Sequence, residues 1–177
     1  MVHSSFKPPE NPDIVLPVEI EGNINHVYVL VRPGTIQFLE ELAQTYELVI
    51  FTASMQKYAE PLMQILDQGN WTSYLLFREH CTFYNGIFVK DLTQIGRSLK
   101  DVIIIDNSPT AYMFQPENAI PSISWYEDKE DTQLLDFVPF LKALSTVDDV
   151  RPFLMASVKD NVLDIDRGMQ LIKSYQE

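Results

Sequence analysis

The chain has 177 residues, with 25 Asp and Glu against 13 Lys and Arg, which gives a formal net charge of −12 at pH 7. This acidic balance argues against general nucleic-acid binding, because the chain would repel the phosphate backbone. Hydrophobic residues make up 46% of the chain and charged residues 21%, as in a globular domain. No apolar run approaches the roughly 20 residues of a membrane span. We expect no signal peptide in residues 1–10, and the single cysteine, Cys81, excludes an internal disulfide.

The first half of the chain alternates between patterns typical of strands and of helices. Residues 1–13 contain Pro and Ser and are predicted to be a loop. Two β-branched runs, 14–20 and 26–31, predict a hairpin whose turn contains Gly22 and Asn23. A helix is predicted after Pro33. It is followed by an apolar strand at 47–51 and a helix at 55–67.

The second half continues this alternation. Asn85-Gly86 predicts a tight hairpin between two short strands. The expected strands are 74–77, 82–84, 87–89, 102–105 and, more weakly, 119–124, and the expected helices are 132–144 and 150–158. Residues 159–177 form an amphipathic tail that the pattern does not assign. Alternating strands and helices with continuous apolar strands predict an α/β fold with a mostly parallel sheet.

Polar residues follow the two most apolar strands, where such sheets bind ligands. Thr52 follows the strand at 47–51, and a hydroxyl there suits a phosphate oxygen, or else caps the next helix. Asp106 and Asn107 follow the strand at 102–105. Their oxygens suit Mg²⁺, or else close the strand in an Asx-turn.

Two basic residues complete this set. Lys90 ends a predicted hairpin strand beside Asp91, and a lone lysine in such a place is usually a solvated surface charge. Arg78 either meets a phosphate or pairs with Glu79 or another acid. A hydroxyl, a lysine and an Asp-Asn pair together are suited to holding a phosphoryl group and a magnesium ion, so we predict that they converge on one edge of the sheet.

Seven segments carry a resemblance to a known family. They are HSSFKP, VYVLVRPG, LVIFTAS, LFREHC, GIFVKDL, IIIDNSP and NAIPSISWYEDKEDTQLLDFVPFL. They resemble the small phosphatases that act on the C-terminal domain of RNA polymerase II, which belong to the haloacid dehalogenase superfamily. The likeness runs from Val2 to about Leu154. It implies a haloacid-dehalogenase-like three-layer α/β fold with a mostly parallel central sheet, an amino-terminal β-hairpin and a small three-stranded insertion around 74–89. Residues 1–158 would form the phosphatase-like domain, and 159–177 an unassigned carboxyl-terminal tail.

The resemblance implies a role for each polar candidate. Thr52 falls on the motif whose hydroxyl binds the transferring phosphoryl group, and Lys90 on the lysine that neutralises it. Asp106 would orient Lys90 and the water shell of the metal, and Asn107 would be a magnesium ligand. Arg78 lies where the family has an arginine that faces the substrate.

The resemblance also implies an apolar pocket for a proline or another apolar residue of a phosphopeptide. The same side chains alternatively form the core of the hairpin. They are Phe6, Val18, Ile20, Val27, Met55 and Tyr58. The partner would be a phosphorylated protein substrate, with nuclear or cytoplasmic localisation by analogy and with neither nucleic acid nor membrane contacted directly.

One family motif, Asp-x-Asp-x-Thr, is not found in these 177 residues. Its first Asp is the nucleophile and a metal ligand, its second is the general acid/base, and it would stand directly before Met1. Asp164-Ile165-Asp166 lacks both the following hydroxyl or valine and a preceding apolar strand. Without the motif we expect no covalent step, weak magnesium binding, and two unpaired strand edges that favour self-association.

Three interpretations stay open. The sequence is an amino-terminally shortened version of a working phosphatase, or a pseudoenzyme that binds phosphopeptides or proteins, or a chain whose missing strand comes from elsewhere. We favour the first for the activity of the family and predict that a polypeptide of these residues alone is inactive. The sequence does not name the substrate.

Overall fold

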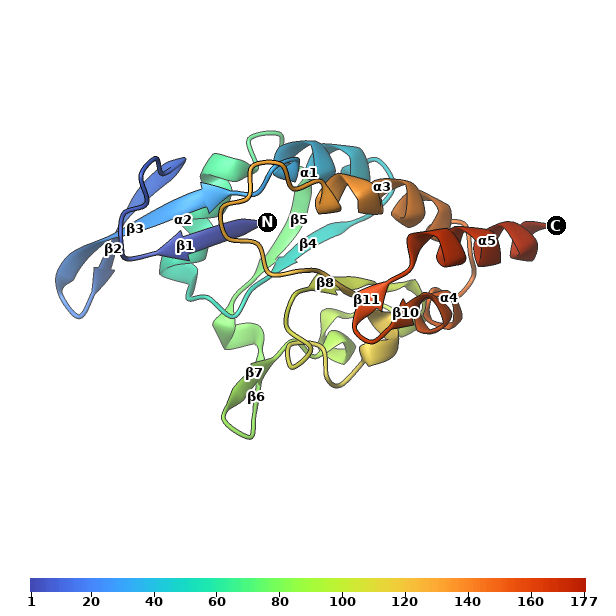
Figure 1. Cartoon of the computed structure of the whole chain (residues 1–177). Coiled ribbons are helices and arrows are strands. Elements are labelled where there is room, and N and C mark those ends of the chain that lie inside the picture. Colours follow the sequence, from blue (N-terminus) through green and yellow to red (C-terminus); the bar gives the residue numbers. More distant parts are fainter. The chain divides into compact units, whose positions relative to one another are not determined.

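The computed structural model describes all 177 residues, Met1–Glu177, which divide into two compact units (Figure 1). The first unit contains residues 1–78 and 124–135, and the second contains 79–123 and 136–177. No helix of the structure combines the length and the hydropathy needed to cross a membrane.

The first unit contains a three-stranded antiparallel sheet in the order β1-β3-β2. Its strands are β1 (Val2–Ser5), β2 (Ile14–Ile20) and β3 (Asn23–Val31). Glu21 and Gly22 form the two-residue turn between β2 and β3, with φ of 51° and 79°, as a type I′ turn requires. The predicted hairpin is therefore confirmed, and its second strand begins earlier than expected, at Asn23.

The amino-terminal segment corrects a prediction. Residues 1–13 were expected to be a loop, but Val2–Ser5 pair with β3, from Val2 opposite Val31 to Ser5 opposite Tyr28. The four residues Val-His-Ser-Ser carry no strand pattern of their own. Their conformation is decided by the free edge of β3, which offers backbone hydrogen bonds.

Four further elements belong to the first unit. They are α1 (Thr35–Ala43), β4 (Leu48–Phe51), α2 (Gln56–Leu66) and β5 (Thr72–Leu76). Strands β4 and β5 pair in parallel, with Phe51 opposite Leu76. The predicted three-stranded insertion is thereby corrected, because its expected first strand lies in this parallel pair instead.

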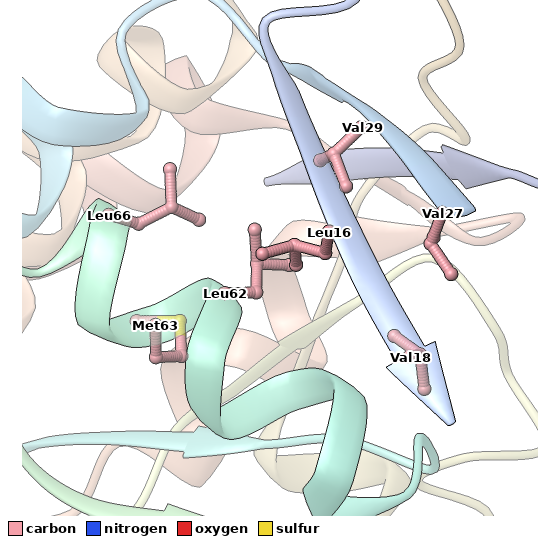
Figure 2. Packing of buried hydrophobic residues seen from close by; sticks show 7 residues of the cluster. All are labelled: Leu16, Val18, Val27, Val29, Leu62, Met63 and Leu66. Atoms are coloured by element: carbon pink, nitrogen blue, oxygen red, sulfur yellow. The ribbon is translucent and has the colours of Figure 1, made fainter. Parts of the chain in front are cut away.

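The core of the first unit lies between α2 and the antiparallel sheet (Figure 2). Alternation along β2 and β3 turns every second side chain to one face, as the period of a strand requires. Helix α2 places apolar side chains against this face. The buried residues of the cluster are Leu16, Val18, Val27, Val29, Leu62, Met63 and Leu66.

The second unit contains three separate two-stranded sheets. Strands β6 (Thr82–Tyr84) and β7 (Ile87–Val89) form the hairpin that Asn85-Gly86 predicted, with φ of 48° and 83° in the turn. Strands β8 (Ile104–Asp106) and β9 (Ala119–Pro121) pair in parallel. Short 3₁₀ helices cover Arg78–His80, Leu92–Ile95, Leu99–Asp101 and Pro116–Asn118.

The tail that the sequence left unassigned is folded. Helix α3 (Gln133–Leu144) begins in the first unit and continues in the second, and α4 (Arg151–Ser157) follows it. A short hairpin of β10 (Val158–Lys159) and β11 (Val162–Leu163) leads into α5 (Ile165–Gln176). Figure 1 shows α5 beside α4, and the two helices are in contact.

The parallel strands have limited pairing. Strand β4 is hydrogen-bonded to β5 alone, and β8 to β9 alone. Each of the two apolar strands predicted from sequence therefore has one strand neighbour and one unpaired edge. This agrees with the expectation of unpaired edges on the strands at 47–51 and 102–105.

Candidate active site

Lys90 and Asp106 form an ion pair in the second unit. Lys90 directly follows β7, and Asp106 ends β8. Lys90 Nζ lies 2.5 Å from Asp106 Oδ2, and the two side chains are 12% and 10% exposed. The Lys90 backbone N–H donates to the Ala111 carbonyl at 2.7 Å. Lys90 is therefore not a solvated surface charge, and the pairing with Asp106 that the resemblance implied is present.

The carboxylate of Asp106 has a second contact. Its Oδ1 accepts a hydrogen bond from the Ser108 backbone N–H at 2.8 Å, which forms an Asx-turn at the end of β8. The Asx-turn alternative for Asp106 is thus confirmed, and its other carboxylate oxygen binds Lys90. Asp106 is fixed in place as a partner for a cation.

Tyr112 is a residue of this region that the sequence analysis missed. It is 4% exposed and packs in a core cluster with Leu92 and Ile104. Burial, and then the negative charge of Asp106, raise the pKa of the Tyr112 hydroxyl. That hydroxyl donates to Asn161 Oδ1 at 2.8 Å. The available signal was a tyrosine within an apolar segment, because a buried phenol needs a hydrogen-bond partner.

These residues do not by themselves form a magnesium site. Mg²⁺ prefers octahedral oxygen coordination that includes at least one or two carboxylates. Both oxygens of Asp106 are engaged, one by Lys90 and one by the Ser108 N–H. No group of three or more His, Cys, Asp or Glu side chains is placed to hold a metal ion. The role of Asn107 as a metal ligand stays a prediction.

Thr52 lies in the first unit, directly after β4. Its backbone N–H donates to Leu76 at 2.8 Å and so extends the pairing with β5. Its Oγ1 accepts from the Ser54 N–H at 3.0 Å. The alternative that Thr52 caps the next helix is wrong, because α2 begins at Gln56 and its N-cap is Met55.

Arg78 is attached to the same turn. Its Nε donates to the Ala53 carbonyl at 2.7 Å, and its backbone N–H donates to the Ser54 carbonyl at 3.0 Å. The side chain is otherwise exposed. Thr52, Ser54 and Arg78 therefore belong to one hydrogen-bonded turn.

The six apolar residues of the predicted peptide pocket all belong to the first unit. Val18 and Val27 are 4% and 6% exposed and are members of its core. Phe6 is 64% exposed and Met55 38%. Ile20 and Tyr58 are partly buried against the core cluster. Val18 and Val27 thus fit the hairpin-core alternative, whereas Phe6 and Met55 are accessible.

Tyr58 has a polar contact in addition. Its hydroxyl is hydrogen-bonded to the Ser4 hydroxyl, which joins α2 to β1. Burial raises the pKa of Tyr58, and the bond to Ser4 lowers it in part, so the net shift is upward. Tyr58 therefore stays protonated at neutral pH and acts as a neutral hydrogen-bonding group.

The carboxylates at 164 and 166 have local roles. Asp164 is the N-cap of α5 and accepts from the Arg167 N–H at 2.9 Å, and Asp166 lies in the first turn of that helix. They do not follow a buried apolar strand, which agrees with their exclusion as a nucleophile motif.

The predicted residues are thus grouped within the two units. Thr52 and Arg78 share a turn in the first, and Lys90, Asp106 and Asn107 share a strand end in the second. The convergence of Thr52 with the other three stays a prediction.

Comparison with known proteins identifies relatives. The family model described as NLI interacting factor-like phosphatase matches residues 1–151. A probable C-terminal domain small phosphatase of Dictyostelium discoideum is 54% identical over 151 residues, which is 85% of this chain and 49% of that protein. The human CTD small phosphatase-like protein is 52% identical over 154 residues, which is 87% of this chain and 56% of that protein. The chain spans about half the length of these curated relatives.

The fold is also found in solved structures. Fission yeast Fcp1, an RNA polymerase II CTD phosphatase solved with bound beryllium fluoride, superposes with a TM-score of 0.57 at 18% identity. The alignment covers 98% of this chain and 58% of that one. This likeness confirms the haloacid-dehalogenase-like α/β fold. Because the family model covers residues 1–151, the chain belongs to the NLI interacting factor-like phosphatases.

Proposed function

We propose that these residues form the phosphate-binding part of a phosphoserine/phosphothreonine protein phosphatase of the RNA polymerase II C-terminal-domain type. The observation that carries the proposal is the Lys90–Asp106 ion pair at the carboxyl end of a parallel strand. A buried lysine held by a carboxylate is suited to neutralising a phosphoryl group in transfer. Relatives of about 50% identity with phosphatase names support the activity class.

Each residue has one proposed task. Lys90 neutralises the charge that develops on the phosphoryl oxygens, and Asp106 holds the lysine in position. The Thr52 hydroxyl donates a hydrogen bond to the same phosphoryl group, and Arg78 attracts the phosphate of the substrate. Phe6 and Met55, which are accessible, contact an apolar residue of the substrate peptide, and Val18, Ile20, Val27 and Tyr58 complete the apolar set.

The chemical step needs groups that these 177 residues do not supply. Phosphoryl transfer through an aspartyl-phosphate needs an attacking carboxylate and a proton donor for the leaving oxygen, and here no Asp-x-Asp-x-Thr motif is present. Loss of a nucleophile costs about 10⁶-fold in rate in another hydrolase. For a protein that carries the two carboxylates of that motif, we also propose a bound magnesium ion with Asn107 as one of its ligands.

The test is hydrolysis of p-nitrophenyl phosphate with added Mg²⁺. We expect no turnover by a polypeptide of residues 1–177, and turnover once a strand that ends in Asp-x-Asp-x-Thr precedes Met1. Lys90→Met in the extended form serves as the matched control and should abolish turnover. Activity of the short form would contradict this proposal.

A second candidate function is a non-catalytic phosphopeptide- or protein-binding module. It is favoured by the turn at Thr52, in which Arg78 Nε donates to the Ala53 carbonyl and the Thr52 hydroxyl accepts from the Ser54 N–H. An extended form that stays inactive would favour this module. It should bind a phosphoserine-proline peptide without turnover, and Arg78→Ala should weaken the binding.

The unpaired edges of β4 and β8 support a further part of the proposal, which is self-association of the short polypeptide. Light scattering after gel filtration at increasing concentration should give a rising mean mass.

The substrate is proposed to be a phosphorylated protein in the nucleus or cytoplasm, by analogy with the relatives.

A further inference from the structure

The carboxyl-terminal hairpin is hydrogen-bonded to the segment that holds Lys90. Tyr112 donates its hydroxyl proton to Asn161 Oδ1 at 2.8 Å, across 49 residues of sequence. Asn161 lies in the turn between β10 and β11, and β11 contacts β9. Residue 161 lies outside the span 1–151 that the family model matches.

Segment 108–115 of the second unit, called the bracket below, is held together by its own backbone hydrogen bonds. The Ala111 N–H donates to Ser108 O at 2.9 Å, and the Gln115 N–H donates to Tyr112 O at 3.0 Å. Tyr112 itself is buried in the core cluster beside β8. The bracket is thus internally hydrogen-bonded and anchored through the Tyr112 ring and hydroxyl.

The bracket is hydrogen-bonded to the backbone of Lys90. The Lys90 N–H donates to Ala111 O at 2.7 Å. Gln115, which is 6% exposed, accepts from the Leu92 N–H and donates to Asp91 Oδ1, both at 3.0 Å. Residues 90–92 are therefore fixed by residues 111–115, and the position of the Lys90 side chain follows from that attachment.

We infer that Asn161 is a positioning residue, which holds Tyr112 and through the bracket keeps Lys90 against Asp106. The inference rests on the proposed function of Lys90. Removal of either the Tyr112 hydroxyl or the Asn161 amide breaks the hydrogen bond between them. Segment 108–115 should then be held less firmly. The hairpin beyond residue 151 then serves the site.

Asn161 has an alternative explanation, which the test must separate. Asp160 and Asn161 have φ of 50° and 59°, and Asn is favoured in such a turn regardless of its side-chain contacts. Asn161→Gly keeps the turn and removes the acceptor. Asn161→Asp keeps both the turn and an acceptor oxygen. Tyr112→Phe keeps the ring and removes the donor, and Asp160→Asn is the control in the neighbouring turn position.

The first measurement is amide hydrogen exchange by NMR on the full chain. Tyr112→Phe and Asn161→Gly should each speed exchange of the Lys90 amide roughly fivefold, which is the loss of one hydrogen bond. The double variant should equal the single ones, and Asn161→Asp and Asp160→Asn should match the wild type. An unchanged Lys90 amide, or equal acceleration of the β8 amides, overturns the inference, because the latter indicates opening of the whole unit.

The second measurement is the affinity for a phosphoserine-proline peptide. Tyr112→Phe and Asn161→Gly should weaken binding by the same factor, and Asn161→Asp should restore it. Unchanged affinity in a binding-competent wild type overturns the inference. A wild type that binds no phosphopeptide overturns the proposed function instead, and the exchange rates then decide the positioning contact alone.

Discussion

Arg32 and Asp131 form a bidentate ion pair inside the first unit. Arg32 Nε donates to Oδ1 at 2.6 Å and Nη2 donates to Oδ2 at 2.7 Å, and the side chains are 2% and 6% exposed. The pair fastens the loop after Ser124 to the end of β3 across 99 residues of sequence. Buried paired charges are costly to separate, so this contact governs how the unit responds to acid.

The stability of the first unit should fall in acid. Hydrogen bonds from Arg32 lower the pKa of Asp131 below its ordinary value. Since the unfolded chain then binds the proton more readily, the stabilisation is full above the ordinary pKa of about 4 and is lost as pH falls through the lower folded-state value. Arg32→Met removes this dependence and should cost about 3–5 kcal/mol at neutral pH.

Urea unfolding of the wild type and of Arg32→Met between pH 7 and pH 2 measures the free energy of unfolding and checks this prediction. Lys129→Met is the control, because Lys129 pairs with Asp13 at 3.4 Å on the surface and both side chains are about half exposed. It should change the free energy of unfolding by less than about 1 kcal/mol. Parallel pH profiles for Arg32→Met and wild type would contradict the assignment.

Lys90→Met should destabilise the second unit by about 3 kcal/mol, because it leaves the carboxylate of Asp106 buried without its cation. Adding Asp106→Asn should recover part of the loss, since the unpaired charge is removed. Chemical denaturation of both variants measures this, with Lys173→Met on the exposed face of α5 as the control. Equal destabilisation by Lys90→Met and Lys173→Met would show that the Lys90–Asp106 ion pair does not stabilise the second unit.

Gly168→Ala should destabilise the packing of α5. A Cβ at this position would lie 2.5 Å from Phe140 Cε2 and 2.9 Å from Ser157 Oγ, and Phe140 and Ser157 are almost fully buried. Overpacking of this kind costs about 1–3 kcal/mol. Thermal unfolding should give a lower Tm for Gly168→Ala and none of this loss for Gln170→Ala, which is exposed on the same helix. A Tm equal to that of the wild type would mean that α5 shifts freely.

Thr52→Val should weaken binding of a phosphoserine-proline peptide by about tenfold to a hundredfold, the loss of one hydrogen bond to a charged group. Thr52→Ser keeps the hydroxyl, which also accepts from the Ser54 N–H, and should bind nearly as the wild type does. Isothermal titration calorimetry measures both. If the serine variant were as weak as the valine variant, the methyl group and not the hydroxyl would be the relevant part of Thr52.

The sequence predicted the elements whose pattern is local. The hairpin of β2 and β3, the Asn85-Gly86 turn, the apolar strands β4 and β8 and helices α1 to α3 were all expected, because periodicity and turn chemistry belong to neighbouring residues. The seven segments that carry the resemblance also indicated the phosphatase family, which the comparisons confirm.

Other features depended on partners distant in sequence. Strand β1 forms because β3 has an edge to offer, β5 pairs with β4 and not with the insertion, and α5 packs because Gly168 admits Phe140. The carboxylate of Asp106 binds Lys90 and Ser108 at once, and the hydroxyl of Tyr112 finds Asn161 far along the chain. Residue types and their spacing thus determined the local elements and the family resemblance, whereas tertiary packing alone decided which groups meet, since pairing energies arise only when the chain has folded.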